Sequence, residues 1–131
     1  MASAPIYIID THPLVWYFED SPRLSAAAKR AFVEIEQGSA LGVVPTIVLA
    51  EIMHLADRKR IPLSIADTIA RVKASSFGIV SLDHMVILLM VPLKTLELHD
   101  RVIVATAKFF EASLITKDEQ IRESGTVPCV W

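Results

Sequence analysis

Ile6-Tyr7-Ile8-Ile9-Asp10 is a short, β-branched run that ends in a carboxylate, and it is typical of a buried strand. Thr11 and Pro13 follow directly and suit the first turn of a helix. Apolar runs and helix starts go on alternating along the rest of the chain. This alternation predicts an α/β fold in which helices cover both faces of a parallel sheet.

Hydrophobic periodicity and the turn residues between apolar runs locate the other elements. We expect strands at residues 40–44, 78–82, 114–116 and, at a sheet edge, 127–130. The expected helices cover residues 14–18, 25–37, 46–60, 65–74, 85–91, 100–112 and 118–123. Segment 85–91 is apolar on every side, so it is either a helix buried all round or one packed against a partner.

The composition suits one compact domain over residues 1–131. Apolar residues make up 53% of the chain and the net charge is −2, so a sizeable core is available and a broad basic surface is not. The most apolar run is far shorter than the ~20 residues that span a bilayer, so we expect no membrane segment. Cys129 is the one cysteine, and no secretory signal is visible, which favours a cytoplasmic location.

Four acidic residues are placed where separate elements would converge. Asp10 and Asp118 each follow an expected strand, Glu51 lies inside the helix at 46–60, and Asp100 begins the helix at 100–112. In open parallel sheets, ligands bind beyond the carboxyl ends of the strands. Carboxylates brought together repel each other unless a cation compensates, and oxygen-only ligand sets suit magnesium or manganese. The pattern therefore predicts a metal-dependent enzyme that acts on phosphate esters.

Each acid also has a simpler interpretation. Asp10, Asp100 and Asp118 could merely cap the helices that follow them. Glu51 stands among apolar neighbours and could instead pair with His54, three residues further along the helix. We favour metal coordination because the other three acids can reach the same rim of the sheet.

Five segments around these acids carry recognisable motifs. They are Asp10-Thr11-His12-Pro13-Leu14-Val15-Trp16, Pro45-Thr46-Ile47-Val48-Leu49-Ala50-Glu51-Ile52, Leu98-His99-Asp100-Arg101-Val102-Ile103-Val104-Ala105-Thr106-Ala107, Leu114-Ile115-Thr116-Lys117-Asp118 and Val130-Trp131. In this order they resemble the PIN-domain family, and within it the VapC-type toxins of bacterial and archaeal toxin–antitoxin pairs. The most specific likeness is that of the third segment to the family's D-R-x-I-x-A-T-A signature. One departure is His99, where many relatives have phenylalanine or alanine.

The resemblance implies a three-layer α/β/α sandwich with a central, mostly parallel sheet. It also implies a magnesium- or manganese-dependent endoribonuclease, the toxin of a type II toxin–antitoxin pair, with Asp10, Glu51, Asp100 and Asp118 as metal ligands and catalytic residues. Its implied partners are an RNA substrate, a VapB-like antitoxin and a second copy of the chain in a homodimer. The alternative is a non-catalytic PIN-like binding module, although such modules typically lose one or more of the acids.

In the expected mechanism, metal-activated hydroxide attacks phosphorus in line and leaves a 5′-phosphate and a 3′-hydroxyl. Thr11 and Thr116 could bind water or a substrate oxygen, and Thr116 could equally be an ordinary strand-end residue. Arg101 and Lys117 could touch the RNA backbone, with an ion pair to a neighbouring acid as the alternative for Arg101. His12 is interpreted as a residue beside the ligands or on the surface. The basic run 58–60 is expected to complement a helix dipole, with RNA contact as the minority alternative.

Overall fold

Strand β1 (Ile6–Ile9) lies at the centre of a five-stranded sheet in the computed structural model, which describes residues 3–131. The strand order is β3-β2-β1-β4-β5, and every neighbouring pair is parallel. Ile8 pairs with Val43 on one side and with Leu114 on the other. The remaining strands are β2 (Leu41–Pro45), β3 (Phe77–Val80), β4 (Ser113–Ile115) and β5 (Cys129–Val130). The predicted parallel sheet is confirmed, with 129–130 as an edge strand.

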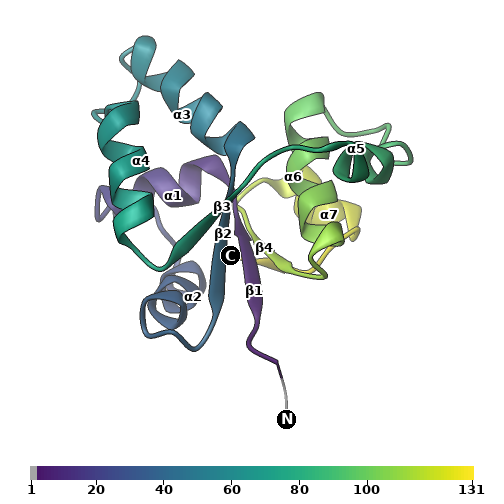
Figure 1. Ribbon diagram of the computed structural model, residues 1–131, viewed down its shortest axis with the longest axis horizontal. Coiled ribbons are helices and arrows are strands. Elements are labelled where there is room, and N and C mark those ends of the chain that lie inside the picture. Colours follow the sequence, from purple (N-terminus) through teal and green to yellow (C-terminus); the bar gives the residue numbers. More distant parts are fainter. Residues whose placement is uncertain (1–2) are drawn as a thin grey trace.

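Helices cover both faces of this sheet, which confirms the three-layer arrangement. Figure 1 shows α1 to α4 on one side and α5 to α7 on the other. The first group comprises α1 (Thr11–Phe18), α2 (Ala26–Glu36), α3 (Thr46–Asp57) and α4 (Ile65–Ala74). The second comprises α5 (His84–Met90), α6 (Leu98–Phe109) and α7 (Glu119–Ser124). None of the helices in residues 3–131 combines the length and apolar character needed to cross a bilayer.

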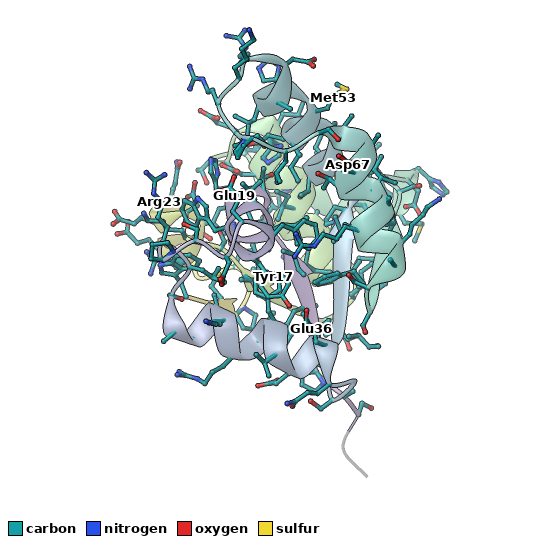
Figure 2. All side chains as sticks on the ribbon, turned by 90° about the vertical axis from the view of Figure 1, so that its left-hand side faces the viewer. Tyr17, Glu19, Arg23, Glu36, Met53 and Asp67 are labelled. Carbon is teal, nitrogen blue, oxygen red and sulfur yellow. The ribbon has the colours of Figure 1, made fainter. Side chains whose placement is uncertain are left out.

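Helix α1 is wedged into the core, as its apolar sequence predicts. Leu14 and Val15 are fully buried. Tyr17 stacks on Phe32 of α2 with the ring centroids 4.2 Å apart, and its hydroxyl donates a hydrogen bond to Glu36 (Figure 2). The helix therefore holds its first turn, which carries Thr11 and His12, in a fixed place at the end of β1.

Local capping signals set most helix boundaries. The Ser25 hydroxyl accepts from the amide of Ala28 to start α2, and Ser64 does the same for Asp67 to start α4, each at 3.1 Å. Gly38 follows α2 with a φ of +78°, a conformation that favours glycine at a helix end. These boundaries agree with the prediction.

Several boundaries differ from the expectation, and three differences have a clear local cause. Thr46 is a residue type that suits a helix cap, but it is the first residue of α3, Pro45 occupies the cap position, and no side chain caps this end. The same helix ends at Asp57, because Lys59 adopts a φ of +57° and takes the chain off the helical path. Helix α6 begins at Leu98, since Glu97 is the extended residue before it, so Asp100 sits inside the first turn and does not cap.

Helix α5 is not buried all round within this chain, so that expectation is wrong for a single copy. Val86 and Met90 are buried, whereas the opposite face is open, with Leu88 62% and Ile87 49% exposed. The exposure arises because α5 lies at the periphery and packs mainly on α6. Packing against a partner is the alternative that stays open.

Candidate functional site

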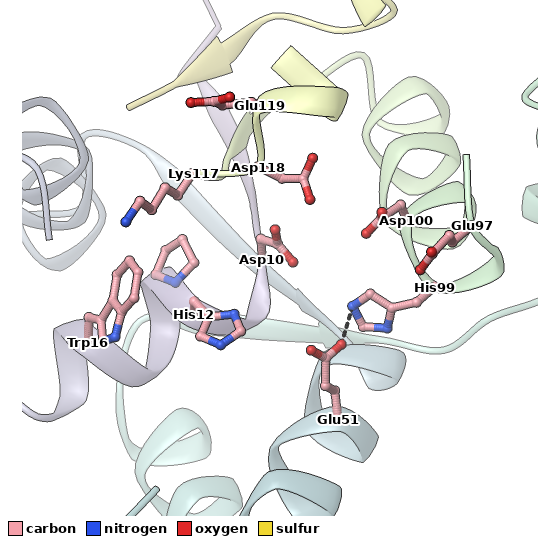
Figure 3. A pocket seen from close by; sticks show the side chains of 11 residues that line it. Asp10, His12, Trp16, Glu51, Glu97, His99, Asp100, Lys117, Asp118 and Glu119 are labelled. Atoms are coloured by element: carbon pink, nitrogen blue, oxygen red, sulfur yellow. Dashed lines mark ion pairs between the residues drawn. The ribbon is translucent and has the colours of Figure 1, made fainter. Parts of the chain in front are cut away.

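The sheet changes direction beside β1, and a pocket opens at this point. From β1 the chain proceeds to β2 on one side, while β4 pairs on the other, so the helices that follow diverge to opposite faces. Such a switch point leaves a crevice beyond the carboxyl ends of the strands. A pocket of about 620 Å³ lies there (Figure 3), lined by Asp10, His12, Pro13, Trp16, Glu51, Glu97, His99, Asp100, Lys117, Asp118 and Glu119. The four acids predicted from the sequence all line it.

Asp10 is held by the ends of two strands. One of its carboxylate oxygens accepts from the amide of Thr11 at 2.8 Å, and the other accepts from the hydroxyl of Thr116 at 2.7 Å. Its own amide donates to the carbonyl of Ile115. Burial raises the pKa of Asp10, and the hydrogen bonds from Thr116 and Thr11 only partly offset it. Asp10 thus caps α1, because its side chain accepts a hydrogen bond from the Thr11 amide, and its carboxylate also faces the pocket.

Thr116 connects Asp10 to Asp118. The buried hydroxyl of Thr116 donates to Asp10 and accepts from the amide of Asp118 at 3.1 Å. Asp118 in turn caps α7 by accepting from the amide of Ile121 at 2.9 Å. Asp118 therefore does cap the helix that follows it, as the simpler interpretation predicts, and its side chain also lines the pocket. Thr116 orients both acids.

Asp100 enters the pocket from the first turn of α6. Within residues 3–131, no hydrogen bond supports its carboxylate. Burial, followed by the charges of Asp118 and Asp10, raises the pKa of Asp100 to about 6. Such a shift indicates that burial and the neighbouring negative charges together outweigh the opposing charge of His99.

Glu51 pairs across the pocket with His99, which the sequence reasoning did not identify as a site residue. The two side chains form an ion pair between α3 and α6 (Figure 3), so Glu51 is not paired with His54. Burial would raise the pKa of Glu51, but the hydrogen bond and charge of His99 outweigh it and lower the value. For His99, burial would lower the pKa, and Glu51 outweighs it and raises the value. The available signal was the unusual histidine directly before Asp100.

The other predicted residues have different positions. The hydroxyl of Thr11 is buried and has no hydrogen-bond partner in the described part of the chain, although its proximity contributes to the lowered pKa of Glu51. Arg101 donates to the carbonyls of Met90 at 2.8 Å and Val91 at 3.4 Å. It thereby ties the end of α5 to α6, a role that neither proposed alternative included. The basic run 58–60 is exposed and is not among the residues that line the pocket.

The donor chemistry of the pocket fits a hard divalent cation. Six carboxylates line it, against one lysine, and carboxylate oxygens are the ligands that Mg²⁺ and Mn²⁺ prefer. The unpartnered Thr11 hydroxyl and the raised pKa of Asp100 both indicate unsatisfied polar groups at this place. Within residues 3–131, no three His, Cys, Asp or Glu side chains already stand in an arrangement that could hold an ion. Binding would therefore need side-chain movement or bridging water.

Comparisons with known proteins agree with this geometry. A family model described as "PIN domain" matches residues 7–125. The fold is similar to that of VapBC2 from Rickettsia felis, bound to promoter DNA, at 14% identity and a TM-score of 0.69, covering 95% of this chain and 96% of that one. It is also similar to a toxin–antitoxin complex from Klebsiella pneumoniae, at 23% identity and a TM-score of 0.60, covering 86% of each chain.

A further similar structure is FitAcB from Neisseria gonorrhoeae, at 17% identity and a TM-score of 0.67, covering 94% of this chain and 95% of that one. No curated protein matches the chain. At these identities the likeness to solved structures shows the fold.

Proposed function

Because the chain belongs to the PIN-domain family, whose members are generally nucleases, we propose that it is a divalent-metal-dependent endoribonuclease and the toxin of a toxin–antitoxin pair. The observation that carries this proposal is the convergence of Asp10, Glu51, Asp100 and Asp118 on one pocket from four separate elements. Retention of all four acids favours catalysis over a non-catalytic PIN-like binding module.

The four acids are the proposed ligands for Mg²⁺ or Mn²⁺. When bound, such an ion lowers the pKa of water and offsets the charge on phosphate oxygens, which is the chemistry that phosphodiester hydrolysis requires. Thr116 and the Thr11 amide hold the carboxylate of Asp10 in one orientation. The capping bond from Ile121 does the same for Asp118. The expected products carry a 5′-phosphate and a 3′-hydroxyl.

The test is incubation of the purified chain with total cellular RNA in Mg²⁺ or Mn²⁺, beside an Asp10→Asn variant and a chelator. We expect cleavage at discrete sites, lost with the chelator and reduced about 100- to 1,000-fold in Asp10→Asn. The matched control is Asp67→Asn, which makes the same chemical change on the exposed surface of α4 (Figure 2) and should cleave at the wild-type rate.

Other outcomes of this experiment would contradict parts of the proposal. Cleavage that survives Asp10→Asn would point to a different site or a contaminant. Products with a 2′,3′-cyclic phosphate would exclude the hydrolytic mechanism. RNA binding without cleavage in either metal would favour the binding module.

The proposed partners are a VapB-like antitoxin and a second copy of this chain. Support for the antitoxin comes from the similar solved structures, whose names describe VapBC and toxin–antitoxin complexes. Support for the homodimer comes from the open apolar face of α5, where Met85, Ile87 and Leu88 are 48%, 49% and 62% exposed. A contiguous apolar face of this kind is a typical interface in a soluble protein.

Sedimentation at micromolar concentration tests the homodimer. We expect a dimer for the wild type and a shift toward monomer for Leu88→Ser. Val33→Ser removes a comparable exposed apolar side chain from α2, on the other face of the sheet, and should leave the dimer intact. A wild type that sediments as a monomer would exclude the dimer at this concentration.

A further inference from the structure

The pocket has two chemically different sides. Most of the carboxylates occupy one side and the centre, while His12, Trp16 and Lys117 form the other side, which we call the aromatic wall and which Glu119 flanks above Lys117 (Figure 3). The acids account for metal binding in the proposed function. The aromatic wall has no part in that role, because an oxygen-ligand site does not need it.

Trp16 is the rigid base of this wall. Its side chain is only 8% exposed and packs against Trp131, with ring centroids 5.8 Å apart. The ring of His12 lies 5.6 Å from that of Trp16, and the side chain of His12 is exposed. The ammonium of Lys117 lies 5.3 Å from the Trp16 ring centroid, within the range of a cation–π contact. Both solvent-facing members of the wall therefore rest on one fixed, buried ring.

The sequence ties this wall to the acids at a fixed spacing. His12 is two residues after Asp10 in the first turn of α1, and Lys117 stands between Thr116 and Asp118. Since Thr116 holds Asp10 and Asp118 together, it also fixes the chain on which Lys117 stands. A ligand group on the wall would thus be placed at a set distance from the acids.

The charge of the pocket explains what such a ligand would need. A metal at the acids can compensate one phosphate, but the neighbouring phosphates of a nucleic acid would still face carboxylates. Among the described residues that line the pocket, Lys117 is the only lysine or arginine. It is the place where a second phosphate meets a permanent positive charge, although Glu119 flanks it.

We infer that the aromatic wall is a nucleotide subsite: a base of single-stranded RNA stacks on His12 while Lys117 binds the adjacent backbone phosphate. An exposed flat ring beside a cation is the combination that binds unpaired nucleotides, because every base offers a face for stacking and every link offers a charge. A paired base would have no free face for His12. The inference rests on the proposed function and names the part of the substrate that this site takes.

The experiment measures equilibrium binding of a 12-nucleotide single-stranded oligoadenylate to the full chain, by fluorescence anisotropy at two salt concentrations. Ca²⁺ replaces Mg²⁺ so that the acids are neutralised by another oxygen-seeking ion, and a gel verifies that the probe stays whole. The variants are His12→Ala, His12→Phe and Lys117→Gln. The matched controls are His84→Ala and Lys108→Gln, which are exposed and do not line the pocket.

We expect His12→Ala to weaken binding about tenfold, which is within the range for one lost stacking contact, and His12→Phe to restore it to within about twofold. Lys117→Gln should weaken binding more at low salt than at high salt and reduce the slope of log affinity against log salt by about 0.7, the value for one phosphate on a single strand. The two controls should bind as the wild type does. Thermal unfolding verifies that each variant is folded.

Three results would overturn the inference, and they differ in what they mean for the proposed function. If the wild type binds the probe and the wall variants bind it equally well, the subsite is wrong and the ribonuclease proposal stands. If the wild type binds no RNA and cleaves none, both proposals fail. Failure of His12→Phe to restore binding in a folded variant would exclude stacking as the contact.

Discussion

Two pairs of acids meet in the pocket, and the chain supports them in different ways. Asp10 and Asp118 follow β1 and β4. The Asp10 carboxylate accepts hydrogen bonds from the Thr11 amide and the Thr116 hydroxyl, and the Asp118 carboxylate accepts one from the Ile121 amide. We call them the sheet-side acids. Glu51 and Asp100, the helix-side acids, come from α3 and α6. Glu51 is paired to His99 on α6, and the carboxylate of Asp100 has no hydrogen bond within residues 3–131.

This difference shows which carboxylates of a site a parallel sheet can orient through its own backbone and neighbouring side chains. At the carboxyl ends of the strands, free amides and a threonine hydroxyl hold a carboxylate locally. Glu51 lies in the middle of α3, where the backbone amides are already used within the helix, so its carboxylate needs a partner from elsewhere. Asp100 lies in the first turn of α6, but its carboxylate accepts no hydrogen bond from an amide within residues 3–131. The sheet-side acids are oriented by hydrogen bonds close to them in the chain and by Thr116, whereas Glu51 depends on His99 from another helix and Asp100 has no hydrogen-bond partner within residues 3–131.

The largest expected effect comes from breaking the sheet-side support. Thr116→Val keeps the shape of the side chain but removes the hydroxyl that joins Asp10 to Asp118. We expect RNA cleavage to fall about 10- to 100-fold, the usual cost of losing a group that orients a metal ligand. Unfolding should become easier by about 1–3 kcal/mol, because a buried carboxylate loses a donor. Cleavage assays and denaturant titration measure the two quantities.

Thr106→Val is the matched control for that change. The hydroxyl of Thr106 is also buried, but it donates to the carbonyl of Val102 in its own helix. Its loss should leave the cleavage rate within about twofold, as expected of a substitution that leaves the site's groups in place. Equal losses of activity in both variants would show that Thr116 acts through general stability and does not orient the acids.

The second expected effect distinguishes the pairs by the sign of a stability change. Asp100→Asn removes a carboxylate that its neighbours repel, so the metal-free chain should become more stable. Its raised pKa corresponds to a gain of about 1 kcal/mol at neutral pH once solvent screening of a half-exposed group is included. Asp118→Asn should change stability by less than about 0.5 kcal/mol, because asparagine caps a helix as well as aspartate does.

Thermal unfolding in a chelator measures both variants. Destabilisation by Asp100→Asn would mean that its carboxylate has a partner in solution and that the two pairs do not differ as described.

The smallest expected effect is on pH dependence. The pKa of Asp100 is about 6 in the folded chain and near 3.8 when unfolded, so the folded state binds the proton more tightly. Stability of the metal-free chain should therefore rise as pH falls from 7 to 5, by about 0.5 kcal/mol from this residue after screening. His99 acts in the same direction, since its pKa is raised as well.

Comparison of wild type with Asp100→Asn by denaturant titration at pH 7 and pH 5 isolates the contribution of Asp100. A wild type and a variant with the same pH dependence would contradict the assignment of the raised pKa to Asp100.

The sequence predicted the sheet-side acids more fully than the helix-side ones. Asp10 and Asp118 could be located because each follows a short apolar run within a few residues. The run predicts a strand, and the aspartate after it must then lie near the carboxyl end of that strand. Glu51 was recognised as needing a partner, but the partner came from α6, a contact that no local pattern contains. His99 was missed for the same reason. The set of four was recognised from where the acids fall among the expected elements, and the resemblance to PIN domains added its own implied role for them; the family assignment is confirmed.

The sequence predicted the burial of α1 correctly but left that of α5 open, because contacts with distant parts of the chain decide it. The apolar runs at residues 14–18 and 85–91 look alike in sequence, yet α1 is buried and α5 has an open face. The difference comes from their neighbours in the fold: α1 packs against α2 and α3, whereas α5 packs mainly on α6. The composition of a segment does not specify such neighbours. The hydrogen bonds of Arg101 were likewise not foreseen, since its partners are carbonyls at the end of α5 that no charge pattern reveals.

The central position of β1 has a consequence for how quickly the protein can fold. The bond between Thr116 and Asp10 joins residues that are 106 positions apart, and β1 is incomplete until β4 pairs with it. Closing so long a loop costs entropy before any contact repays it, so folding should be slow for a chain of this size. Asp10 cannot take its place in the site until β4, which leads to Asp118, has paired with β1. Under the proposed function, RNA cleavage should therefore appear only in the final phase of refolding, and partly folded chains should not cleave RNA.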